Sequence, residues 1–181
     1  MSRRPLLGLV LILAAAFFYY RPDPAINFPW DGRSETAGQK EFSGRVSRVA
    51  DGDSIEMKQS GRTIRIRLYG IDAPELNQDH GPEARDWLAD RLLGKTVRIE
   101  TQDIDQYERL VALVFIDDAP INQALVSAGQ AWVYERYCSI DLCRQMQRDE
   151  REARQKKLGL WGKKDKPTPP WRWRRSNPSR Q

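Results

Sequence analysis

The stretch from Ile64 to Glu75 limits most strictly what this chain can fold into. Its first half alternates apolar and polar residues with a period of two, which predicts a strand. The residues expected to face a core are Ile64, Ile66 and Leu68, and those expected to face outward are Arg65, Arg67 and Tyr69. Gly70 and Pro74 end the strand, because glycine and proline both interrupt strand pairing. Asp72 and Glu75 are therefore expected on a loop where the strand ends.

Carboxylates and arginines brought together in this way suggest phosphate chemistry. Hard cations such as Ca²⁺ and Mg²⁺ prefer oxygen ligands, which Asp53, Asp72 and the carbonyl of Ala73 can supply. The planar guanidinium of Arg67 matches the oxygens of a phosphate. Glu75, where it is not a ligand, is free to take a proton from water.

The flanking segments predict a small barrel with helices rather than alternating strand and helix units. Residues 41–58 read as a hairpin around Asp51-Gly52, and two more strands are expected near Val97 and over 110–116. Helices are expected over 81–94, 120–128 and 141–157. Strands first, with helices inserted and appended, are typical of a barrel.

At several of these positions the chain resembles the thermonuclease family of staphylococcal nuclease-like proteins, and in particular its exported or anchored bacterial members. The matching motifs are VADGDS at 49–54, RLYGIDAPE at 67–75, DQYER at 105–109, INQALVSAG at 121–129 and LGLW at 158–161. Several ordered motifs over residues 41–161 are more specific than any one of them. The resemblance implies an α+β fold, mainly β, built as a five-stranded OB-fold barrel with three helices.

The resemblance also implies a set of site residues. Arg67, Glu75 and Arg109 match the catalytic residues, and Asp53, Asp72 and the Ala73 carbonyl match the ligands of one Ca²⁺ ion, which is favoured over Mg²⁺. The tyrosines expected to line the nucleotide pocket are Tyr107 and Tyr134, with simple packing as the alternative for each.

The implied activity is hydrolysis of DNA or RNA with little sequence specificity, leaving 3′-phosphate ends. The alternative is a catalytically weak or inactive, membrane-tethered module that binds nucleic acid. Glu108 favours this alternative, because it stands where the family usually has glycine, next to Arg109.

The first 40 residues predict export. Residues 1–22 combine Arg3 and Arg4 with an uncharged apolar run, which fits either a cleaved signal peptide or an uncleaved anchor. Residues 23–40 are rich in turn-forming residues and are expected to be a linker. The remainder of the chain is expected outside the cytoplasm as one monomeric domain, held at the membrane if the anchor is kept.

Two further features follow from composition. Cys138 and Cys143 are the only cysteines, and an oxidising compartment favours a disulfide between them over two free thiols. From Arg144 onward there are 13 Lys and Arg against 4 Asp and Glu, so the positive surplus lies at the end of the chain. The tail, residues 162–181, is expected to bind nucleic acid or a membrane, or to serve only as a solubilising segment that packs a tryptophan on the domain.

Overall fold

The computed structural model describes residues 41–163 and 165–178 of the 181-residue chain. The expected signal or anchor (residues 1–22) and the expected linker (residues 23–40) lie outside the described residues. Among the helices of the described part, none combines the length and the apolar character that crossing a membrane requires.

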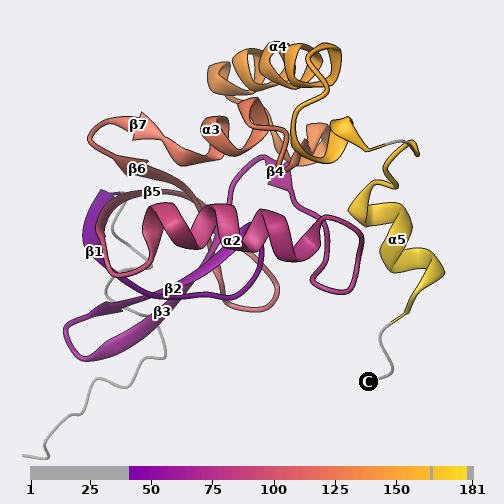
Figure 1. Cartoon of the computed structure of the whole chain (residues 1–181). Coiled ribbons are helices and arrows are strands. Elements are labelled where there is room, and N and C mark those ends of the chain that lie inside the picture. Colours follow the sequence, from indigo (N-terminus) through magenta and orange to yellow (C-terminus); the bar gives the residue numbers. More distant parts are fainter. Residues whose placement is uncertain (1–40, 164, 179–181) are drawn as a thin grey trace, which may run out of the picture. The chain divides into compact units, whose positions relative to one another are not determined.

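Five strands form a closed barrel. They are β1 (Glu41–Val49), β2 (Ser54–Gln59), β3 (Arg62–Leu68), β5 (Thr96–Ile104) and β6 (Leu110–Ile116). The antiparallel order is β3-β2-β1-β5-β6, and β3 also pairs with β6 in parallel, which closes the barrel. A short extra strand, β7 (Ala119–Pro120), continues the sheet beside β6. The predicted α+β class and five-stranded OB-fold barrel are confirmed (Figure 1).

The alternation that predicts β3 also sets its pairing. Ile66 lies opposite Ile55 on β2 and Leu110 on β6, and all three side chains are buried in the core. Because successive side chains of a strand point to opposite faces, Arg67 leaves the barrel core and reaches its outer surface. The candidate site lies on this outer surface, at the end of β3.

One predicted orientation is wrong. Tyr69 was expected to face outward, but its side chain is buried. The strand ends at Leu68, so the alternation no longer applies to Tyr69. The Tyr69 hydroxyl lies 3.2 Å from Ser139 Oγ and accepts a hydrogen bond from the Ser139 backbone nitrogen at 2.9 Å.

The described residues contain four α-helices. Three of them, α2 (Gly81–Leu92), α3 (Ile121–Ser127) and α4 (Asp141–Gln155), are the helices expected from the sequence. The fourth, α5 (Pro170–Ser176), lies in the segment expected to be a tail. Single turns of 3-10 helix, η2 (Glu135–Tyr137) and η3 (Gly159–Gly162), complete the fold. In Figure 1, α2 crosses the front of the barrel and α4 lies beyond α3.

A small second sheet fixes the chain where β3 ends. β4 (Ile71–Asp72) pairs with β8 (Trp132–Val133), which places Asp72 opposite Trp132. The backbone nitrogen of Tyr134 then donates to the carbonyl of Gly70 at 2.8 Å. Asp72 and Tyr134 are thereby held close to the end of β3, although they are far apart in sequence.

A side chain of α3, Asn122, holds the turn between β3 and β4 through hydrogen bonds. Asn122 Nδ2 donates to the carbonyls of Tyr69 at 2.9 Å and of Ala112 at 3.2 Å. Its Oδ1 accepts a hydrogen bond from the backbone nitrogen of Val114 at 3.0 Å. This buried amide side chain thus satisfies backbone groups of both β6 and the turn.

Gly70 allows the turn to approach the disulfide. Its φ is +73°, and a Cβ at this position would lie 2.4 Å from Cys138 Sγ. Cys138 is joined to Cys143 by a disulfide whose Cα atoms are 5.6 Å apart. The bridge connects the start of α4 to the segment that follows η2, beside the turn.

Candidate active site

A cavity of about 890 Å³ lies on the outer surface of the barrel, where β3 ends. Every candidate catalytic, metal and nucleotide residue of the sequence analysis lines it: Asp53, Arg67, Asp72, Ala73, Glu75, Tyr107, Arg109 and Tyr134. These residues come from four separate parts of the chain, which the fold brings together around one cavity.

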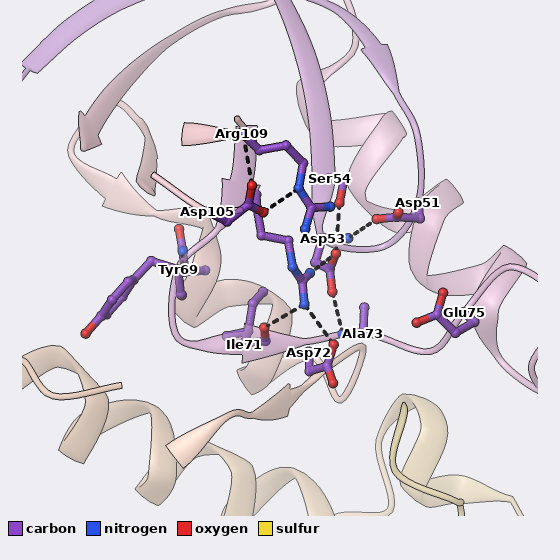
Figure 2. A network of polar contacts seen from close by, with 12 residues as sticks. Asp51, Asp53, Ser54, Tyr69, Ile71, Asp72, Ala73, Glu75, Asp105 and Arg109 are labelled. Atoms are coloured by element: carbon purple, nitrogen blue, oxygen red, sulfur yellow. Dashed lines mark hydrogen bonds and ion pairs between the residues drawn. The ribbon is translucent and has the colours of Figure 1, made fainter. Parts of the chain in front are cut away.

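Arg67 is the centre of a polar network that includes Asp53 and Asp72, both labelled in Figure 2. Its guanidinium forms one ion pair with Asp53 and another with Asp72, where Nη2 donates to Oδ1 at 2.7 Å. The other oxygen of Asp53 accepts a hydrogen bond from the Ala73 backbone nitrogen at 2.7 Å. Ser54 Oγ donates to Asp53 Oδ1 at 3.1 Å. Two carboxylates, one from the loop between β1 and β2 and one from β4, therefore converge on one positive charge.

This network is largely removed from water. The side chain of Arg67 is 16% exposed and that of Asp72 only 1%. Burial lowers the pKa of the Arg67 guanidinium, although Asp72 and Asp51 act in the opposite direction. Burial likewise raises the pKa of the Asp51 carboxyl, which accepts a hydrogen bond from the Asp53 backbone nitrogen at 3.0 Å. Buried charges of this kind are stable only when they are paired.

Arg109 is held by Asp105. Its Nε donates to Asp105 Oδ2 at 2.7 Å, and its backbone nitrogen donates to Asp105 Oδ1 at 3.0 Å. Burial acts to raise the pKa of the Asp105 carboxyl, but the hydrogen bonds from Arg109 and from the Tyr107 backbone lower it below its usual value. Figure 2 shows Asp105 and Arg109 above Asp53, on the same side of the network.

Glu108 adopts the left-handed conformation, with φ of 60°. The family's usual glycine at this position would adopt it without cost, whereas a residue with a Cβ is strained there. The side-chain partner of Arg109 is Asp105 and not its neighbour Glu108. In the described residues Glu108 therefore does not draw the guanidinium away from the cavity.

Glu75 lies farther along the loop, at the edge of the network in Figure 2. Its side chain is 37% exposed, so water reaches it. The Glu75 backbone nitrogen donates to Gln78 Oε1 at 3.2 Å, which fixes the start of the loop. The Glu75 side-chain oxygen Oε1 accepts a hydrogen bond at 2.6 Å from Arg174 of α5.

The two candidate nucleotide-contacting tyrosines differ in their surroundings. Tyr107 is 62% exposed and lies beside Arg109, with its ring centroid 5.5 Å from the Arg109 Cζ atom. Tyr134 stacks on Trp171 of α5, with ring centroids 5.3 Å apart and planes 4° from parallel. One ring face of Tyr134 is therefore already covered by the protein.

The carboxylates offer a hard, all-oxygen donor set. Asp53 and Asp72 each place an oxygen on the same Arg67 guanidinium, so one cation between them could contact both. Within the described residues, no group of three or more His, Cys, Asp and Glu side chains could hold a metal ion. The remaining coordination positions of a cation would fall to backbone carbonyls, water and substrate, which Ca²⁺ and Mg²⁺ both accept. The site fits a hard divalent ion.

Three charged residues of the cavity bond to predicted site residues but are not themselves predicted from the sequence as part of the site: Asp51, Asp105 and Arg174. Asp51 and Asp105 lie within the matching motifs, and Asp105 stands four residues before Arg109, a spacing at which the two can pair. No comparable signal connects Arg174 to Asp72 across 102 residues of sequence. His80, the only histidine, is absent from the cavity lining and instead lies 2.8 Å from Gln130 Oε1.

Comparisons with known proteins agree with this geometry. The family model described as staphylococcal nuclease homologue matches residues 65–163. An uncharacterized endonuclease from Escherichia coli O157:H7 is 44% identical over 135 residues, which cover 74% of this chain and 86% of that protein. Micrococcal nuclease from Shigella flexneri is 38% identical over 149 residues, covering 76% and 83%. An uncharacterized endonuclease from Haemophilus influenzae is 35% identical over 132 residues, covering 72% of each.

Proposed function

The chain belongs to the staphylococcal nuclease family, and we propose that it is a Ca²⁺-dependent endonuclease that cuts nucleic acid and leaves 3′-phosphate ends. Family membership supports the coarser statement, an endonuclease that hydrolyses phosphodiester bonds. One observation carries the proposal: Arg67, Asp53 and Asp72 form one buried network, and Glu75 and Arg109 line the same cavity.

Asp53, Asp72 and the carbonyl of Ala73 would hold the metal ion. When bound, the ion supplies a positive charge that polarises the scissile phosphate. Ca²⁺ is proposed in preference to Mg²⁺ because two carboxylates and a carbonyl leave an irregular, partly open shell, which Ca²⁺ tolerates better.

The residues of the chain supply the remaining chemistry. Glu75 is exposed enough to orient a water molecule and to accept its proton as the water oxygen bonds to phosphorus. The bond from phosphorus to the 5′-oxygen breaks, and this oxygen leaves and is protonated. Arg67 and Arg109 donate to the phosphate oxygens as charge builds on them, a stabilisation by fixed donors. Asp105 keeps Arg109 in place for this role.

Nucleic acid would be bound without base reading. The proposed contacts are guanidiniums to phosphate and tyrosine rings, Tyr107 and Tyr134, to bases or sugars. Neither kind of contact distinguishes one base from another, so DNA and RNA with varied sequences are expected as substrates.

We also propose that the protein works outside the cytoplasm as a monomer, at the membrane if residues 1–22 remain attached. The disulfide between Cys138 and Cys143 supports an oxidising compartment, because such bonds persist there and not in the cytosol. The apolar run of residues 1–22 supports export.

The alternative is a catalytically weak or inactive module that binds nucleic acid at the membrane. Its sequence support is Glu108, and the pairing of Arg109 with Asp105 weakens that support. The contact of Arg174 with Asp72 and Glu75 favours the alternative, because it occupies two acidic groups of the site.

The deciding experiment compares cutting of double-stranded and single-stranded DNA by the full-length wild type, Arg67→Ala and Glu75→Gln. With Ca²⁺ the wild type should cut and leave 3′-phosphates, and Arg67→Ala should be slower by about 10³-fold, since one lost transition-state donor commonly costs 10² to 10³. Glu75→Gln should bind DNA but cut slowly.

Arg62→Ala is the matched control, because Arg62 lies on the same strand and is exposed. It should leave cutting nearly unchanged. If the wild type binds DNA yet cuts no faster than Arg67→Ala under Ca²⁺ or Mg²⁺, the binding module is the correct reading.

A further inference from the structure

Arg174 of α5 occupies two acidic groups of the proposed catalytic site. Its Nη2 donates to Asp72 Oδ2 at 2.8 Å, and its Nη1 lies 3.2 Å from Asp72 Oδ1. The same Nη1 donates to Glu75 Oε1 at 2.6 Å. The guanidinium thus grips Asp72 with both nitrogens and reaches Glu75 with one of them, a strong arrangement for an arginine and carboxylates.

The contact leaves neither oxygen of Asp72 without a cationic partner. Its Oδ1 is shared by Arg67 and Arg174, and its Oδ2 is taken by Arg174. The Asp72 side chain is 1% exposed, so water cannot replace these partners in place. A divalent cation that binds Asp72 therefore competes with Arg174 for the same two oxygens.

Several other contacts dock α5 and the segment before it at the same edge of the cavity. Trp173 Nε1 donates to Asn77 Oδ1 at 3.3 Å, and Gln78 Nε2 donates to the Thr168 carbonyl at 2.5 Å. Trp171 stacks on Tyr134. These partners lie on the loop that carries Glu75 or, in the case of Tyr134, in the cavity lining itself.

We propose that Arg174 is a resident cation of the metal site, which a divalent ion must displace, so that metal binding undocks α5 from the cavity. The inference rests on the proposed function, because it takes Asp72 as a metal ligand. Without the ion, Arg174 supplies the positive charge that Asp72 and Glu75 need. With the ion bound, two positive charges, the ion and the Arg174 guanidinium, lie beside the same carboxylates. They repel each other, so the guanidinium leaves its position.

Few residues of α5 are buried against the rest of the molecule. Pro170 is the one fully buried residue of α5, while Trp171 and Trp173 are half-buried and the four remaining residues are exposed. The helix has seven residues and contributes little to the core of the barrel. Its docking therefore depends mainly on the Arg174 contacts, the Trp171 stack and the hydrogen bonds at Trp173 and Thr168.

The same movement would free the nucleotide-contacting surface. Trp171 covers one face of the Tyr134 ring, the residue proposed to contact substrate. Undocking α5 exposes that face at the moment at which the metal arrives. The docked helix α5 therefore blocks both the metal site and one face of Tyr134, and metal binding would open both.

The test is a calorimetric titration of full-length protein with Ca²⁺ alone, without substrate. In the wild type only the molecules in which Arg174 has left Asp72 can bind the ion, so removing the guanidinium raises the apparent affinity. Arg174→Gln should therefore bind Ca²⁺ about 10- to 100-fold more tightly than the wild type, the range expected for losing charged hydrogen bonds. Trp171→Ala weakens the docking of α5 without touching Asp72, and it should tighten binding in the same direction.

Arg175→Gln is the matched control. It removes the same charge one residue away, and Arg175 makes no side-chain hydrogen bond or ion pair within the described residues, so its Ca²⁺ affinity should stay within about twofold of the wild type. Equal affinity of Arg174→Gln and wild type, or an equal gain in Arg175→Gln, contradicts the inference while leaving the metal site intact. If neither the wild type nor Arg174→Gln binds Ca²⁺, the proposed metal site is wrong and the inference falls with it.

Discussion

At the scale of single residues, Arg67 explains why two buried aspartates can coexist beside the barrel. Asp53 and Asp72 approach each other because each pairs with the same guanidinium. Without that charge, the two buried carboxylates would repel each other. Arg67 therefore assembles the site in addition to its proposed contact with substrate, and replacing it by alanine should affect both tasks.

Glu108 provides a test at this scale, because its left-handed backbone is strained. Glu108→Gly should raise the free energy of unfolding by about 0.5 to 1 kcal/mol. Glycine removes the strain of a Cβ in this conformation, but part of that gain is lost because glycine has more conformational entropy in the unfolded chain. Its cutting rate should stay close to that of the wild type, since Arg109 is anchored by Asp105. Chemical denaturation and a DNA cutting assay measure the two quantities.

Glu108→Ala separates charge from backbone strain. It removes the carboxylate but keeps a Cβ at a φ of 60°, so its stability should match that of the wild type. A large gain in cutting by both variants would show instead that the carboxylate restrains Arg109.

At the scale of elements, the turn between β3 and β4 decides where the carboxylates lie. β4 pairs with β8, Asn122 of α3 binds the turn, and the disulfide passes beside it. The distance from Gly70 to Cys138 leaves no space for a side chain. Precise placement of Asp72 therefore depends on one glycine in the turn.

Gly70→Ala should consequently be costly. The strained φ and the overlap with Cys138 Sγ together predict a loss of about 2 to 4 kcal/mol in the free energy of unfolding, and a fall in activity as Asp72 shifts. Gly61→Ala is the control, because Gly61 has a similar φ of 77° but no atom within 4 Å of the added Cβ. It should lose only about 1 kcal/mol. If denaturation shows equal losses in the free energy of unfolding for the two variants, the close approach to the disulfide does not contribute to the cost.

The sequence predicts elements well where a local pattern decides them. The period-two alternation of Ile64, Ile66 and Leu68 locates β3, and Asp51-Gly52 locates the hairpin turn. The alternation fails at Tyr69, because the strand ends one residue earlier than the pattern predicts. α5 was missed as a helix, although Pro170 at its first turn and Trp171 and Arg174 three residues apart are typical helix signals.

At the scale of the whole molecule, the order of the motifs predicts which residues share one cavity. It does not predict Arg174, because nothing local specifies where a seven-residue helix docks 102 residues after Asp72. The basic surplus from Arg144 onward was expected to attract polyanions at a distance. Part of it instead meets the carboxylates of the chain itself, at the proposed metal site.

The most direct test of the proposed site is the rate of DNA cutting by the full-length protein as a function of Ca²⁺ concentration, for the wild type and for Asp53→Asn. The wild type should be silent in chelator and saturate with Ca²⁺. Asp53→Asn should need at least about 100-fold more Ca²⁺, since loss of even an outer-shell partner commonly costs 10- to 100-fold in metal affinity. Asp86→Asn, on the exposed side of α2, should follow the wild-type curve. Cutting that persists in chelator, or an unchanged Ca²⁺ midpoint in Asp53→Asn, would contradict a metal-dependent nuclease site built on Asp53 and Asp72.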